Sequence, residues 1–130
     1  MKWAVLIVRT LVGVTFLVFG LNFFLNFLEI PAPPSGPAAD FLGVLVPTGY
    51  MTVVKVLEAA GGLLLITGRW APVGITLVTP VAVNILLYEV LLLGQPGIGV
   101  ALVAMCAFLV VGYWKHFRGV FASTDCAGCC

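Results

Sequence analysis

The chain has 130 residues, of which 62% are hydrophobic and only 8% are charged. Soluble domains carry about 25% charged residues, so this composition indicates an integral membrane protein. The six Lys and Arg residues are scattered rather than clustered with aromatic residues, which excludes a nucleic-acid-binding surface. The net charge of +1 says nothing about partners, because the placement of charges along a membrane chain matters more than their sum.

The first apolar run predicts a membrane-spanning helix over residues 4–27. It is longer than the core of a secretory signal, which has about 7 to 15 residues, so we interpret it as a retained helix. One face at helical spacing contains Arg9, Gly13, Phe16, Gly20 and Phe27. The two glycines predict that a neighbouring helix comes close beside Arg9.

A proline-rich loop follows, at residues 29–40. Proline cannot continue a helix, so this segment is expected to be extended and exposed. Residues 41–47 are apolar but too short to span, which predicts an interfacial or re-entrant segment between the first two spans.

The second predicted span, residues 50–67, carries Lys55 and Glu58 within its apolar run. A charge near the bilayer centre costs at least ~2.5 to 3.5 kcal/mol, so both side chains need partners inside the protein. Residues three apart share a helix face. We therefore expect this face to point toward protein and not toward lipid.

The third predicted span covers residues 72–92 and the fourth covers residues 98–114. Pro80 is expected to kink the third span and to free the carbonyl of Thr76. Asn84 and Tyr88 are four residues apart and share a face beyond this kink. The predicted fold is an all-α bundle of four transmembrane helices.

The basic residues predict the orientation. Lys and Arg lie near the two termini and in the loop after the second span, whereas the segments on the opposite side carry Glu29, Asp40 and Glu89. The positive-inside rule then places both termini in the cytoplasm. The three tryptophans fall at the same interface, as an aromatic belt does.

The run from Phe41 to Leu92 closely resembles the DoxX family of small bacterial four-helix membrane proteins, and residues 9–24 resemble its first helix. The most specific pieces are TGY-x4-K-x2-E-x2-GG at residues 48–62 and P-x3-NILL at residues 80–87. Relatives often have a histidine shortly after NILL, where this chain has Glu89, so a role for that histidine does not transfer. The family takes its name from a small subunit of a thiosulfate:quinone oxidoreductase, and some relatives are associated with redox or oxidative-stress assemblies.

A rise of ~1.5 Å per residue places Glu58, Asn84 and Lys55 ~16 to 21 Å from the cytoplasmic helix ends, and Arg9 only ~8 Å. We predict a polar pocket in which Arg9 or Lys55 neutralises Glu58 while Asn84 and Tyr88 orient a quinone head group, a small anion or a proton. The alternative is that these groups only satisfy one another and fix the packing of the helices.

Residues 119–130 form a predicted cytoplasmic tail that contains Cys126, Cys129 and Cys130. In a reducing compartment these thiols could exchange with a thiol partner or share a soft metal ion with another protein. They do not complete a zinc site, and a thiol-rich tail without function is the other interpretation. Cys106 is expected to act as a small hydrophobic residue.

Three functions remain open at this point. The chain is a redox-associated subunit with a quinone or another small ligand in its pocket, a structural or assembly subunit of a larger membrane complex, or a transporter of small molecules. Its surroundings include membrane lipids in each case.

Overall fold

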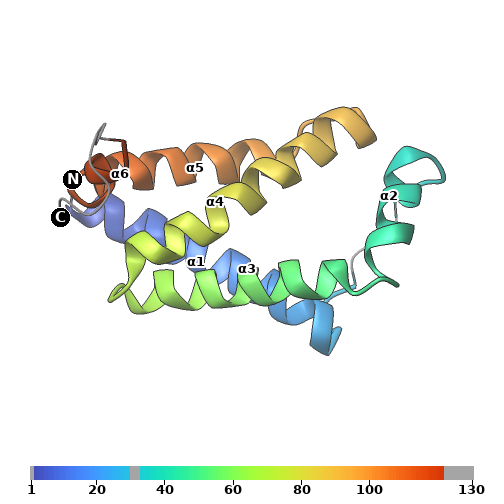
Figure 1. The fold of residues 1–130 in the computed structure, drawn as a ribbon, viewed down its shortest axis with the longest axis horizontal. Helices are drawn as coiled ribbons and strands as arrows, with labels where there is room; N and C mark the ends of the chain where they lie inside the picture. The colour runs from blue at the N-terminus through green and yellow to red at the C-terminus, as the bar shows by residue number, and fades with distance from the viewer. Residues whose placement is uncertain (1, 30–32, 122–130) are drawn as a thin grey trace, which may run out of the picture.

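The computed structural model describes residues 2–29 and 33–121, and these ranges contain helices and no strand (Figure 1). The helices are α1 (Lys2–Leu25), α2 (Pro37–Leu45), α3 (Tyr50–Thr67), α4 (Ala71–Leu87), the π-helix η1 (Tyr88–Leu93), α5 (Ile98–Gly112) and α6 (Trp114–Phe121). The predicted all-α membrane bundle is confirmed.

Three helical stretches are long and apolar enough to cross a membrane: α1, α3 and the continuous stretch Ala71–Leu93. The fourth apolar helix, α5, has only 15 residues. The predicted fourth span runs to residue 114, but the helix ends at Gly112, because Tyr113 leaves helical geometry with φ −107° and ψ 25°. The chain is a multi-pass integral membrane protein.

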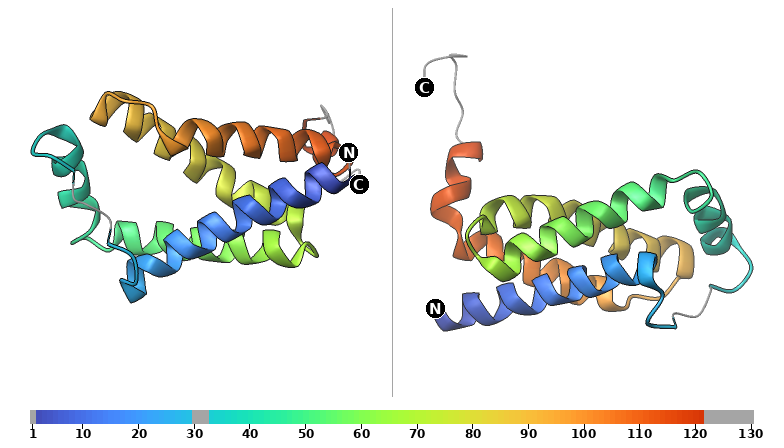
Figure 2. Two further views of the ribbon diagram at one scale, coloured as in Figure 1. Left: turned by 180° about the vertical axis from the view of Figure 1, so that it is seen from behind. Right: turned by 90° about the horizontal axis from the view of Figure 1, so that it is seen from below.

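The helices pack in the order α1, α3, α4, α5, and α5 returns to α1 (Figures 1 and 2). The predicted close approach along α1 is confirmed. A Cβ atom on Gly62 of α3 would lie 2.6 Å from the carbonyl oxygen of Gly13 and 2.7 Å from the backbone nitrogen of Leu17. The absence of a side chain therefore lets the two backbones touch.

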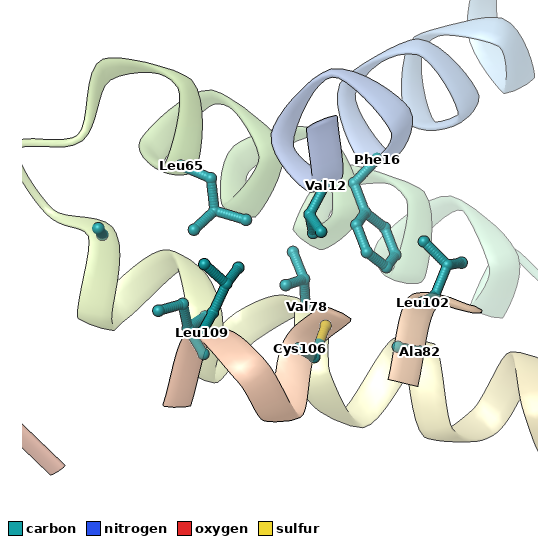
Figure 3. Close-up of a cluster of buried hydrophobic side chains, with 10 residues drawn as sticks. Val12, Phe16, Leu65, Val78, Ala82, Leu102, Cys106 and Leu109 are labelled. Carbon is teal, nitrogen blue, oxygen red and sulfur yellow. The ribbon is translucent and has the colours of Figure 1, made fainter. Parts of the chain in front are cut away.

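Buried apolar side chains from α1, α3, α4 and α5 meet between these helices (Figure 3). Val12, Phe16 and Leu65 lie opposite Cys106, which is fully buried and confirms its predicted hydrophobic role. The other members of this core come from α4 and α5: Ala71, Ile75, Val78, Ala82, Leu102 and Leu109. This core fixes the positions of α3 and α4, which carry the polar residues.

Asn22 closes the end of α1. Its side chain is 6% exposed, and its Oδ1 accepts a hydrogen bond of 2.7 Å from the backbone N–H of Leu28. Asn26 has a φ of 53°, in the left-handed region that asparagine tolerates better than most residues. The helix consequently ends at Leu25, two residues before the predicted end of the span.

Most of the predicted interfacial segment, residues 41–45, belongs to the helix α2. This helix begins at Pro37, a residue suited to the first turn, and ends at Leu45. This helix, α2, lies across the end of the bundle opposite to α6 and contacts η1 (Figures 1 and 2). The third span was predicted as one α-helix, but its last part, from Tyr88 to Leu93, has the wider π-helical turn.

Candidate functional site

Lys55 and Glu58 form an ion pair on α3. The Lys55 Nζ lies 3.1 Å from Oε2 and 3.3 Å from Oε1 of Glu58. The Glu58 side chain is only 3% exposed, whereas the Lys55 side chain is 21% exposed. The pair therefore faces the interior of the protein, with the carboxylate deepest and the ammonium group beside open space.

The open space beside this pair is a pocket of about 470 Å³ between α2, α3, α4 and η1. Four of the five residues predicted to bind a ligand line it: Lys55, Glu58, Asn84 and Tyr88. The remaining lining is apolar or aromatic and consists of Phe41, Leu42, Leu45, Tyr50, Met51, Val54, Pro80, Val81 and Ile85. The site thus has a small polar region within a largely apolar wall.

Asn84 and Tyr88 bring unused hydrogen-bonding groups into the pocket. Within the described residues, neither the Asn84 amide nor the Tyr88 hydroxyl has a hydrogen-bond partner. The Tyr88 ring packs against the Phe41 ring of α2 at a centroid distance of 6.0 Å. Lys55 has three N–H donors, and its contacts with Glu58 leave at least one of them for a ligand. The pocket therefore offers donors from Lys55, Asn84 and Tyr88.

Sequence reasoning did not assign the α2 residues to the site. Phe41 and Leu45 lie four residues apart and therefore share the helix face that covers the pocket. This spacing is visible in the sequence, but it identifies an apolar face and not what that face covers. The position of α2 over the pocket depends on its packing against η1, which is a tertiary contact.

Arg9 lies outside the pocket, so the structure separates it from the other predicted site residues. Its Nη1 donates a hydrogen bond of 3.0 Å to the hydroxyl of Tyr113, and its guanidinium group packs over Gly68 at the end of α3. A cation at a helix C-terminus is favoured by the helix dipole. Of the two partners expected for Glu58, Lys55 is the one found, because Arg9 lies too near the other end of the bundle.

Glu89 caps the start of α5 and has a structural role. Its Oε2 accepts hydrogen bonds from the backbone N–H groups of Gly97 at 3.0 Å and Gly99 at 2.8 Å. A carboxylate at this place satisfies donors that the first turn of α5 leaves free. Glu89 is not among the residues that line the pocket, and its carboxylate ties the start of η1 to the start of α5.

The predicted thiol motif, Cys126, Cys129 and Cys130, lies outside the described residues. Among the residues that the structure describes, no group of three or more His, Cys, Asp or Glu side chains could hold a metal ion.

The comparisons with known proteins agree with this architecture. The DoxX family model matches residues 4–89, which is more than half of the chain and includes the four polar residues of the pocket. No curated protein and no solved structure matches the chain. The extent of the family match establishes that the chain belongs to the DoxX family.

Proposed function

We propose that this protein is a redox-associated membrane subunit whose pocket binds a quinone head group. The observation that carries the proposal is the set of unpaired polar groups in an otherwise apolar pocket: the Asn84 amide and the Tyr88 hydroxyl, beside the Lys55 ammonium group. Asn84 is exposed and Tyr88 is half-buried, and both belong to a helical stretch that can cross a membrane. A polar group that meets hydrocarbon without a partner is costly, so these groups favour a ligand that pairs with them.

The geometry fits a quinone in three respects. The two carbonyl oxygens of a quinone accept hydrogen bonds, which Lys55, Asn84 and Tyr88 can donate. Its flat ring can pack against the aromatic rings of Phe41 and Tyr88. The volume of about 470 Å³ lies within the usual range for small-molecule sites.

Glu58 gives the site a group that can hold a proton. A bound quinone supplies two-electron, two-proton redox chemistry. The Lys55 Nζ contacts both carboxylate oxygens of Glu58 and so orients the carboxylate. The Lys55 side chain also stays exposed to the pocket. In this proposal the quinone takes two electrons from a larger membrane redox complex and two protons to give the quinol. Glu58 passes on the protons one at a time and regains each from water.

Quinone content tests the proposal. The full chain, purified from bacterial membranes in mild detergent, is extracted with organic solvent, and quinone is quantified per protein by mass spectrometry. Tyr88→Phe and Asn84→Leu should each lower the content several-fold, because each removes a donor worth about 0.5 to 1.5 kcal/mol. Tyr113→Phe removes a hydroxyl outside the pocket and loses the bond from Arg9, so unchanged quinone content in this control shows that lost stability alone does not remove quinone. No quinone in the wild-type protein, or equal content in all variants, would refute quinone binding.

The competing function is a structural or assembly subunit. The exposed apolar side chains of the spanning helices suit either lipid or a partner helix. If a stoichiometric partner copurifies while no quinone is extracted, this second function replaces the first.

We also propose that the protein lies in the bacterial inner membrane with both termini in the cytoplasm. The start of α1 and the helix α6 lie at the same end of the bundle (Figure 1). Among the described residues, the Lys and Arg side chains other than Lys55 belong to this end: Lys2, Arg9, Arg69, Lys115 and Arg118. A green fluorescent protein fused after residue 130 should therefore fluoresce, whereas alkaline phosphatase fused there should be inactive.

A further inference from the structure

We infer that the ligand carries a hydrocarbon tail, which leaves the pocket through a groove over η1 and reaches the lipid. This inference rests on the proposed function and specifies its ligand class: an amphiphile with a carbonyl-bearing head and an apolar tail.

A second hollow adjoins the pocket. It has a volume of about 230 Å³ and shares Phe41, Asn84 and Tyr88 with the first. The two hollows therefore meet at these three side chains. The rest of the second hollow consists only of leucines, namely Leu87, Leu91 and Leu92. We call this second hollow the leucine groove.

The polarity of the lining decreases from the pocket to the leucine groove. The ion pair of Lys55 and Glu58 lies in the pocket, the unpaired groups of Asn84 and Tyr88 lie at the junction, and the leucine groove is apolar. A compact polar molecule would occupy the pocket and leave the groove unused. A head group with a tail matches both parts at once, because its polarity changes in the same order.

The groove opens onto the surface that faces the membrane. Leu87 is 49% exposed and Leu91 is 71% exposed, and both belong to a stretch that can span the bilayer. A tail that lies there stays in an apolar environment along its whole length. Lateral entry from the bilayer then brings the head to Lys55 without passing through water.

The π-helical turn places the residues of the junction. In η1, Tyr88 lines both hollows while Leu91 and Leu92 line only the groove. Single π-turns occur often at functional sites because they redirect side chains that a regular helix would place elsewhere. Phe41 of α2 packs on Tyr88 and closes the junction from the other side.

The test combines two ligands with three variants, in nanodiscs of one lipid composition. The ligands are a decyl-substituted benzoquinone and its methyl-substituted counterpart. Leu91→Trp and Leu87→Trp each add bulk at the groove, whereas Val90→Trp adds the same ring at a neighbouring exposed position that lines neither hollow. Comparing variants with one ligand cancels the partitioning of that ligand into the lipid.

We expect Leu91→Trp and Leu87→Trp to weaken binding of the decyl quinone about tenfold relative to Val90→Trp, since extra atoms in a filled site are costly. Binding of the methyl quinone should stay unchanged. If the groove variants leave decyl-quinone binding unaffected, or weaken both ligands equally, the tail does not lie in the groove, and the proposed function survives. If neither ligand binds the wild-type protein, the proposed function itself fails. Thermal unfolding identifies any variant that misfolds. If one of the two groove variants misfolds, the other one decides the result.

Discussion

Replacing Lys55 by methionine tests whether the ion pair is held inside the protein. The Glu58 side chain is 3% exposed, so in Lys55→Met it keeps a buried charge without its cation. Breaking a buried pair by removing one partner costs about 3 to 5 kcal/mol. We expect the free energy of unfolding of Lys55→Met to fall by this amount.

The reverse substitution should cost less. In Glu58→Gln the remaining charge is Lys55, whose side chain is 21% exposed and lines the pocket. Its ammonium group can turn toward the pocket, so we expect a loss of about 1 to 2 kcal/mol, in the range for a single lost hydrogen-bond partner. The double variant leaves no buried charge but leaves the glutamine amide without its partner, so we expect a loss of about 1 to 3 kcal/mol, below that of Lys55→Met and below the sum of the two single losses.

Reversible unfolding by sodium dodecyl sulfate in mixed micelles measures these differences. Val56→Met is the control, because Val56 neighbours the pair but is 52% exposed, and such substitutions usually change stability by less than about 0.5 kcal/mol. Equal losses in Lys55→Met and Glu58→Gln, or additive losses in the double variant, would show that the two charges do not form an inward-facing pair.

Substitutions at three further contacts test the packing, each by thermal unfolding in detergent. Gly62→Ala should cost about 1 to 3 kcal/mol because the added Cβ meets the backbone of α1. In the control Gly43→Ala the added Cβ meets nothing within 4 Å, so this variant should be nearly neutral. Similar losses in the two variants would contradict the close approach of α1 and α3. Tyr113→Phe removes the hydroxyl that accepts from Arg9 and should cost about 1 to 3 kcal/mol, and an unchanged midpoint would disprove the importance of this bond. Glu89→Ala should cost about 0.5 to 2 kcal/mol because it removes a helix cap. Glu89→Gln keeps one acceptor oxygen and should lose less stability. A larger loss in Glu89→Gln than in Glu89→Ala would argue against capping.

The sequence was sufficient to predict the elements whose formation depends on local pattern. The apolar run from residue 50 to residue 67 has the same bounds as α3, since Gly49 and Gly68 flank it with left-handed backbone. The inward direction of Lys55 and Glu58 followed from the cost of a charge in lipid. Gly13 was identified as a contact point from its spacing alone, because only a small residue permits that approach.

The features that depend on tertiary contacts could not be predicted. The hydroxyl that Arg9 contacts belongs to Tyr113, more than a hundred residues away, and no local pattern links the two. The π-helical turn that begins at Tyr88 likewise follows from no local pattern in the sequence. The role of Glu89 as a cap depends on a turn that brings Gly97 and Gly99 back to it.

A density map of the wild-type protein in native-lipid nanodiscs tests the central claim most directly. We predict that Lys55 and Glu58 point into the bundle and that density lies against Lys55, Asn84 and Tyr88 and continues past Leu91 toward the lipid. A map in which the two charged side chains point into lipid, or in which the pocket is filled by the protein's own side chains, would contradict the account.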